Sequence, residues 1–271
     1  MASALTLEQA LAPLTEAPER AAIFLDIDGV LAPIVERAED AGVPEGTSRL
    51  VAELGRRFGR VACVSGRSAS EARRLVGVAE ITYAGSHGVE LLDPGSSEPR
   101  LAPAVAEAAD VVRTFAGERS EDPQLSRLGV RVEDKGAIFA FHWRGVADED
   151  AAREWLEALA READGARLAT HWGRKVLELR PPVAIDKGQA VFALAPGSDG
   201  GAGLFAGDDV TDLDGFSALD TLVGDGRLSA AVKVGVSSDD GPREIVERAD
   251  LVVDGPEGFV EVLAELAGEA R

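Results

Sequence analysis

Short apolar runs alternate with amphipathic segments along the first part of the chain. Ala21–Ile27 is a continuous apolar run that ends in carboxylates, and this pattern predicts a buried strand. Helical spacing follows at Gly46–Phe58, and further strand runs follow at Arg60–Val64 and Ile81–Ala84. A capping box of the Ser-x-x-Glu type opens a predicted helix at Ser68–Val76. Strands that alternate with helices indicate right-handed βαβ units and therefore a parallel sheet.

The pattern changes at Asp93–Pro103, a stretch rich in Pro, Gly and Ser that predicts a boundary. Beyond it the order helix, two strands, helix, two strands predicts a small α+β unit with an antiparallel sheet. The predicted elements are a helix at 104–115, strands at 129–132 and 137–143, a helix at 151–163, and strands at 167–170 and 175–179. Pro181 and Pro182 close this unit, because two prolines stop a strand and a helix alike.

The alternation of strands and helices resumes after the two prolines. The predicted elements are a helix at 187–194 capped by Asp186, strands at 203–207, 231–236 and 251–253, and a closing helix at 258–266. We therefore predict an α/β fold whose parallel-sheet core, 1–100 and 183–271, is interrupted by an inserted α+β cap domain at 101–182.

The composition adds a strong acidic balance to this picture. The 271 residues include 48 acidic and 28 basic ones, a net charge of −20, while 45% are hydrophobic, as in a folded globule. This charge argues against a nucleic-acid binder and against docking on anionic lipid. Cys63 alone cannot form an intrachain disulfide, and no apolar run approaches the ~18 residues of a membrane span. We expect a soluble, cytoplasmic protein with no nucleic-acid or membrane partner.

Two carboxylates, Asp26 and Asp28, follow the first strand run one residue apart, before Gly29. Side chains two apart in a strand share a face, and chemistry in parallel sheets lies beyond the carboxyl ends of the strands. Two close carboxylates need compensation, and hard oxygen ligands suit Mg²⁺. A solvated acidic turn is the alternative interpretation.

A second acidic cluster, Asp208, Asp209 and Asp212, follows the predicted strand at 203–207. Asp208 and Asp212 are four residues apart and would share a face of a helix that starts at once. We expect two such clusters in one sheet to converge on one metal ion, with two unrelated acidic loops as the alternative.

An anion site is indicated where a strand, a turn and a helix start carry Ser65, Gly66 and Arg67. Ser65 supplies a hydroxyl donor, Gly66 permits close backbone approach, and the helix start favours an anion. An ordinary capped helix is the alternative. Lys187 begins another capped helix, where its charge opposes the macrodipole, so we expect it to face a phosphate or a carboxylate.

These four pieces, in this order, resemble the four motifs of the haloacid dehalogenase superfamily of phosphohydrolases. The resemblance implies a Rossmann-like core, a C2-type cap, a Mg²⁺ cofactor and hydrolysis through an aspartyl-phosphate. The stretches Ala84–Glu90, Ala140–Arg144 and Lys175–Pro181 narrow the resemblance to the trehalose-6-phosphate phosphatase family. The chain departs from it at Val30, where many relatives carry Thr.

The resemblance also implies a role for each motif residue. Asp26 would attack phosphorus, and Asp28 would protonate the leaving sugar oxygen and then deprotonate water. The phosphate would be bound by Ser65, Gly66, Arg67 and Lys187. The metal ion would be held by Asp26, Asp208 and the backbone carbonyl of Asp28, with Asp209 and Asp212 beside it or orienting Lys187. The sugar would be bound in the cap by Glu133, Lys135, Arg144, Lys175 and Glu178.

The three histidines receive separate interpretations. His87 lies in a glycine-rich loop and is a candidate for lining the site, whereas His142 and His171 are interpreted as structural residues of the cap.

Alternative functions remain open. They are a phosphatase for a sucrose-, mannosylglycerate- or hexose-phosphate, a non-catalytic subunit that binds a sugar phosphate, and a phosphomutase that uses the same aspartyl-phosphate. In each case we expect a small-molecule sugar phosphate as the ligand. The family resemblance adds a functional link to a separate trehalose-6-phosphate synthase.

Overall fold

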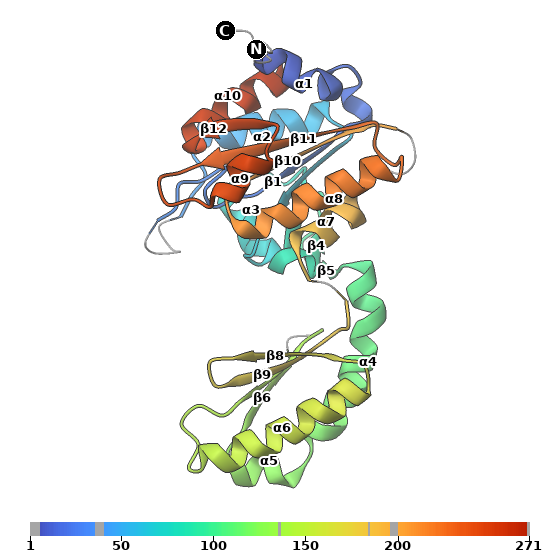
Figure 1. The fold of residues 1–271 in the computed structure, drawn as a ribbon, viewed down its shortest axis with the longest axis vertical. Coiled ribbons are helices and arrows are strands. Elements are labelled where there is room, and N and C mark those ends of the chain that lie inside the picture. The colour runs from blue at the N-terminus through green and yellow to red at the C-terminus, as the bar shows by residue number, and fades with distance from the viewer. Residues whose placement is uncertain (1–5, 36–40, 135–136, 184, 196–199, 270–271) are drawn as a thin grey trace. The chain divides into compact units, whose positions relative to one another are not determined.

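The computed structural model describes residues 6–35, 41–134, 137–183, 185–195 and 200–269. The chain forms two compact units, shown in Figure 1. We call residues 1–100 and 185–271 the core unit, and residues 101–184 the cap unit.

The core unit is built on an eight-stranded sheet with the order β12-β11-β10-β1-β2-β3-β4-β5. The strands are β1 (Ala22–Leu25), β2 (Arg60–Val64), β3 (Thr82–Gly85), β4 (Glu90–Leu92), β5 (Arg100–Leu101), β10 (Ala202–Gly207), β11 (Ala230–Ser237) and β12 (Leu251–Asp254). Pairing is parallel from β12 through to β3, and β4 pairs antiparallel with β3. The parallel α/β core that the sequence predicts is confirmed.

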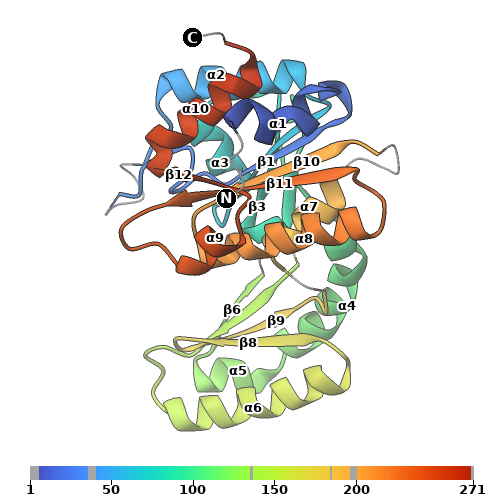
Figure 2. The same cartoon turned by 45° about the horizontal axis from the view of Figure 1, so that its top comes forward.

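Helices cover both faces of this sheet, and Figure 2 shows α2 and α10 on one side of it and α8 and α9 on the other. The helices of the core unit are α1 (Leu7–Thr15), α2 (Glu45–Arg57), α3 (Ala69–Val76), α7 (Lys187–Leu194), α8 (Leu213–Gly224), α9 (Arg243–Arg248) and α10 (Gly255–Ala267), with 3₁₀ turns η1 (Pro18–Arg20), η3 (Ser86–Gly88) and η4 (Val210–Asp212). On the first face, Leu11, Leu54 and Phe259 pack into the buried core. On the second face, Phe205 of β10 meets Phe216 of α8 edge to face, with ring centroids 6.0 Å apart. Covering both faces explains why β1 and β10 read as continuous apolar runs.

Two helix starts next to the predicted motifs are capped as the sequence predicts. The Ser68 hydroxyl accepts the backbone N–H of Glu71 at 3.3 Å at the start of α3. The Asp186 carboxylate accepts the backbone N–H of Gln189 at 2.8 Å at the start of α7. These caps set where each helix begins, and therefore where the turn after β2 and the first residue of α7 lie.

The structure also contains elements that the apolar pattern did not predict. Helix α1 begins at a capping box between Thr6 and Gln9, and buries Leu11 and Leu14. The stretch Asp93–Pro103, predicted as a boundary, contains the short edge strand β5.

The cap unit has a four-stranded antiparallel sheet with the order β6-β7-β9-β8. Its elements are α4 (Pro103–Ser120), α5 (Pro123–Leu128), β6 (Arg131–Asp134), β7 (Phe139–His142), α6 (Glu149–Gly165), β8 (Ala169–Gly173) and β9 (Val176–Arg180). The helices cover one face around a core that includes Phe141, Leu156 and Leu177, all fully buried. This is the α+β architecture that the pattern predicts. Among the helices in the described part of the chain, none combines the length and the apolarity that crossing a bilayer requires.

Candidate active site

Five neighbouring strands of the core unit end at a cavity of about 670 Å³. Each of them supplies a lining residue just beyond its carboxyl end: Asp26 after β1, Ser65 after β2, His87 after β3, Asp208 after β10 and Ser238 after β11. Parallel strands place their carboxyl ends at the same edge of the sheet, so residues far apart in the sequence meet here.

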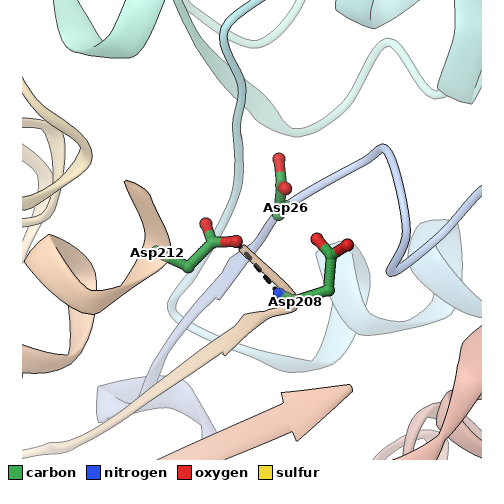
Figure 3. Close-up of side chains that lie close together, drawn as sticks. All are labelled: Asp26, Asp208 and Asp212. Carbon is green, nitrogen blue, oxygen red and sulfur yellow. Dashed lines mark hydrogen bonds between the residues drawn. The ribbon is translucent and has the colours of Figure 1, made fainter. Parts of the chain in front are cut away.

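Three buried carboxylates, Asp26, Asp208 and Asp212, lie together at this edge (Figure 3). One oxygen of each lies within 4.8 Å of the others. Asp212 ends the 3₁₀ turn η4, and its Oδ2 accepts the backbone N–H groups of Asp208 and Asp209, each at 3.0 Å. Asp26 of the first predicted acidic cluster therefore lies beside Asp208 and Asp212 of the second.

Lys187 is the first residue of α7, and its ammonium group lies between two of these carboxylates. Its Nζ is 2.7 Å from Asp212 Oδ1 and 2.9 Å from Asp26 Oδ2. Burial opposes the charged form, but the two carboxylates outweigh burial and hold the pKa of Lys187 above its ordinary value. The side chain is only 3% exposed, so Lys187 is a fixed internal positive charge.

Burial and repulsion from Asp212 act against ionisation of two of these carboxylates. Burial, followed by repulsion from Asp212, raises the pKa of Asp26 well above its ordinary value, although Lys187 opposes this effect. Burial and then repulsion from Asp212 also raise the pKa of Asp208 to about 7. A cation among these groups would offset both effects.

Asp208 shows where a cation fits. Its Oδ1 is buried and finds no hydrogen-bond partner among the described residues. Gly29 approaches the same carboxylate so closely, with φ +83°, that a Cβ there would lie 2.0 Å from Asp208 Oδ2. Carboxylate oxygens are hard donors of the kind that Mg²⁺ prefers. The buried oxygen without a partner and the purely carboxylate donor set therefore fit a magnesium ion.

Asp28 is paired with Arg67 rather than with the other carboxylates. Arg67 Nε lies 2.7 Å from Asp28 Oδ2, and Nη2 lies 2.9 Å from Oδ1, a bidentate arrangement. Arg67 Nη1 also donates to Glu71 at 2.7 Å. Both Asp28 and Arg67 line the cavity. The Asp28 side chain is thus held apart from the three clustered carboxylates, and its expected metal contact through the backbone carbonyl remains a prediction.

Ser65, Gly66 and Arg67 form the turn between β2 and α3, and all three line the cavity. The Ser65 hydroxyl accepts the backbone N–H of Arg67 at 3.2 Å, which holds the turn in shape. Asp209 lines the same cavity but is exposed, and its Oδ1 accepts the N–H of Val210 at 2.7 Å.

Sequence reasoning missed several lining residues, among them Ile34, Val35, Ser238 and Asp240. Ser238 and Asp240 follow β11, a strand that the sequence does predict, so the strand-end rule applied to β11 could have found them. Ile34 and Val35 carry no chemical signal that marks them in the sequence.

The polar face of the cap sheet brings two of the expected sugar-binding residues together. Glu133 pairs in register with Ala140, and Ala140 pairs with Glu178, so the two carboxylates flank one small residue on the same face. His142, interpreted above as structural, is hydrogen-bonded through Nε2 to Glu133 at 2.8 Å. Glu178 accepts a 2.6 Å bond from Arg180.

Two other expected sugar-binding residues lie at one end of the cap sheet. Arg144 donates to the backbone carbonyl of Arg174 at 3.1 Å, and Lys175 is ion-paired with Glu149. Lys135 lies outside the described residues.

Comparison with known proteins identifies the family. A family model described as trehalose-phosphatase matches residues 24–251. The uncharacterized glycosyl hydrolase Rv2006 of Mycobacterium tuberculosis is 37% identical over 217 residues, which are 74% of this chain and 15% of that protein. The trehalose-phosphate phosphatase of Mycobacterium avium is 34% identical over 256 residues, which are 92% of this chain and 62% of that protein. This chain therefore spans less than two thirds of the length of either relative.

Comparison with solved structures shows that this chain shares their fold. The trehalose-6-phosphate phosphatase of Aspergillus fumigatus superimposes with a TM-score of 0.61 at 19% identity, covering 98% of this chain and 99% of that one. The resemblance predicted from the motifs is thereby confirmed at the level of the family. The chain belongs to the trehalose-phosphatase family.

Proposed function

We propose that this protein is a Mg²⁺-dependent phosphatase that hydrolyses trehalose 6-phosphate to trehalose and phosphate through an aspartyl-phosphate. The observation that carries the proposal is the buried carboxylate of Asp26 at the cavity, 2.9 Å from the Lys187 ammonium, with Asp28 two residues further on. The family match supports the choice of substrate.

In the first step, an Asp26 oxygen forms a bond to phosphorus and the bond from phosphorus to the sugar oxygen breaks. Asp28 donates its proton to that leaving oxygen. Lys187 and the Ser65 hydroxyl donate to the non-bridging oxygens, where negative charge must be stabilised.

In the second step, Asp28 accepts a proton from a water molecule whose oxygen bonds to phosphorus. The bond from phosphorus to Asp26 breaks, phosphate leaves, and Asp28 is again protonated. The bidentate contact with Arg67 holds the ionised Asp28 carboxylate at the cavity.

Asp26, Asp208 and the backbone carbonyl of Asp28 would hold Mg²⁺, with Asp209 and Asp212 beside it. When bound, the ion offsets the repulsion between the attacking carboxylate and the phosphate.

Charged side chains of the cap unit would bind the substrate by hydrogen-bonding to its sugar hydroxyls. We assign this role to Glu133, Lys135, Arg144, Lys175 and Glu178. We expect the protein to act in the cytoplasm on a small-molecule sugar phosphate, with a functional link to a separate trehalose-6-phosphate synthase.

The test is phosphate release from a panel of phosphorylated sugars in Mg²⁺, with the wild-type chain and Asp26→Asn. We expect trehalose 6-phosphate to have the highest kcat/KM and Asp26→Asn to release no phosphate above background while keeping its Tm within a few degrees. Asp110→Asn, an exposed change on the cap, is the matched control and should retain full activity.

The outcomes separate the parts of the proposal. An active Asp26→Asn protein would exclude the aspartyl-phosphate. A faster reaction with a sucrose-, mannosylglycerate- or hexose-phosphate would change the substrate and leave the mechanism intact.

A further inference from the structure

The segment Gly85–Gly88, at the carboxyl end of β3, has a backbone that its residues rarely adopt. Ser86 and His87 are consecutive non-glycine residues with φ of +52° and +57°. This left-handed conformation is unfavourable for residues that carry a Cβ, and such positions cluster at functional sites. The conformation persists only where the surroundings hold it.

Backbone hydrogen bonds hold this segment against the turn after β2. Ser86 N–H donates to the Arg67 carbonyl at 2.8 Å, and His87 N–H donates to the Ser65 carbonyl at 3.0 Å. On its other side Gly88 packs against the start of α7, where a Cβ would lie 3.2 Å from the Asp186 carbonyl oxygen. The segment therefore lies between the turn that carries Ser65 and the helix that begins with Lys187.

This backbone places the imidazole of His87 over Gly66. A Cβ on Gly66 would lie 2.9 Å from His87 Nε2, so the ring fills the space that a side chain at position 66 would take. The ring is half-buried and lines the same cavity as Asp26 and Lys187. Among the described residues, nothing is hydrogen-bonded to either ring nitrogen of His87. A polar edge is thus left available at the anion site.

The His87 ring can donate to an anion even when it carries no charge. Burial, and then the charge of Lys187, lower the pKa of His87 against the opposing effect of Asp212 and Asp214. The neutral ring carries one N–H donor. The group of possible metal ligands found among the described residues contains Asp26, Asp208 and Asp212 but not His87.

We propose that His87 is a further phosphate-binding residue, whose imidazole N–H donates to a phosphoryl oxygen beside Ser65 and Lys187. The inference rests on the proposed phosphatase function, and it names the phosphoryl group rather than the sugar as the part of the substrate that His87 contacts. Gly66 is then glycine because the ring above it needs the space.

The test measures binding of inorganic phosphate to the full chain in Mg²⁺ by isothermal titration calorimetry. The variants are His87→Gly and His87→Asn, since glycine and asparagine both tolerate the left-handed backbone while only asparagine keeps an N–H donor. Ser86→Gly is the matched control, because it changes the neighbouring left-handed residue without touching the ring.

We expect the Kd of phosphate to rise about 10- to 100-fold in His87→Gly, the range for losing a hydrogen bond to a charged group. Partial recovery is expected in His87→Asn and no change in Ser86→Gly. The inhibition constant of trehalose, which has no phosphate, should stay the same in all four proteins. This selectivity for the anion is a readout that a purely structural role of His87 would not produce.

Unchanged phosphate affinity in His87→Gly, or equal weakening of phosphate and trehalose, would overturn the assignment. So would a wild-type chain that binds no phosphate. A wild-type chain that binds phosphate through His87 but hydrolyses no sugar phosphate would instead reject the proposed function and keep the binding role.

Discussion

Gly29 and the Asp208 carboxylate occupy adjoining space at the candidate metal site. The left-handed backbone at Gly29, φ +83°, lets the chain turn after Asp28, and the missing Cβ leaves room for Asp208 Oδ2. Any side chain at position 29 would have to displace the carboxylate or the turn.

Gly29→Ala should therefore raise the Mg²⁺ concentration needed for half-maximal activity and lower kcat by at least about tenfold, as expected for misplacing a group at the reacting centre. Gly77→Ala is the control, because φ there is +74° and a Cβ would meet nothing within 4 Å. It should lose about 1 kcal/mol of stability, measured by urea unfolding, and keep its kinetics. Equal kinetic effects in both variants would show that backbone strain alone is responsible.

The raised pKa of Asp208, about 7, has a consequence for metal binding. Without a cation this carboxyl is protonated below that pH, so Mg²⁺ must displace a proton there. The Kd of Mg²⁺, measured calorimetrically, should rise by up to about tenfold per pH unit below 7 and level off above it. In Asp208→Asn this dependence should become shallower, because only the raised pKa of Asp26 then remains, and a flat profile in the wild type would contradict the prediction.

The same raised pKa also predicts the pH dependence of stability. Because the unfolded carboxyl ionises near its ordinary value of 3.8 and the folded one near 7, its contribution to stability is lost as pH rises between those values. Mg²⁺ should therefore raise Tm more at pH 7.5 than at pH 5.5.

Residue chemistry in the sequence predicts some of this site and not the rest. Asp26, Asp28 and Asp208 were found because each follows an apolar run, and strand ends meet in a parallel sheet. The Asp28–Arg67 pair could not be predicted, since it joins residues 39 apart and depends on side-chain conformations. The ring of His87 over Gly66 depends on a backbone conformation that no apolar pattern reports.

At the scale of elements, helix α7 carries Lys187 at its first position. The Asp186 carboxylate caps this helix by accepting the Gln189 N–H at 2.8 Å. The cap therefore fixes the backbone position from which the Lys187 side chain extends. Helix α6 in the cap unit has a cap of the same kind, with Asp148 accepting the Ala151 N–H at 2.9 Å.

Asp186→Ala and Asp148→Ala should each cost about 1 kcal/mol of stability, the usual value for losing such a cap. Only Asp186→Ala should also lower kcat, because only that cap positions Lys187. Denaturant unfolding and steady-state kinetics on both variants check this. A kcat unaffected in Asp186→Ala would show that the ion pairs of Lys187 suffice to place it.

The sequence predicts a strand well where all of its residues are buried. Strand β10 is buried along its whole length and its apolar run marked it, whereas every residue of β8 is exposed. The predicted strand at 167–170 consequently starts two residues before the start of β8 and ends three residues before the end of β8. Helix α5 was missed because its six residues are too short to show a period.

At the scale of the whole molecule, the two units have separate hydrophobic cores. Leu54 belongs to the core of the core unit and Leu156 to that of the cap unit, and both are fully buried. Proteins with two such cores need not unfold in one step.

Leu156→Ala and Leu54→Ala should each lower the free energy of unfolding of the unit that contains the residue by about 2–5 kcal/mol. In calorimetry, Leu156→Ala should lower the midpoint temperature of an unfolding transition whose midpoint does not change on adding Mg²⁺. Leu54→Ala should lower the midpoint temperature of a transition whose midpoint Mg²⁺ raises. A single transition lowered equally by both changes would mean that the units unfold together.

The proposed metal site, formed by Asp26, Asp208 and Asp212 around Lys187, would favour a cation by its charge. Fully ionised, three carboxylates and one ammonium group carry a summed charge of −2, on side chains that are largely buried. A divalent ion would bring the summed charge of this cluster to zero. A monovalent ion would leave it negative, and a trivalent ion would make it positive. The charge of three carboxylates and one lysine at the proposed site would thus favour a divalent cation, whatever its radius or coordination geometry.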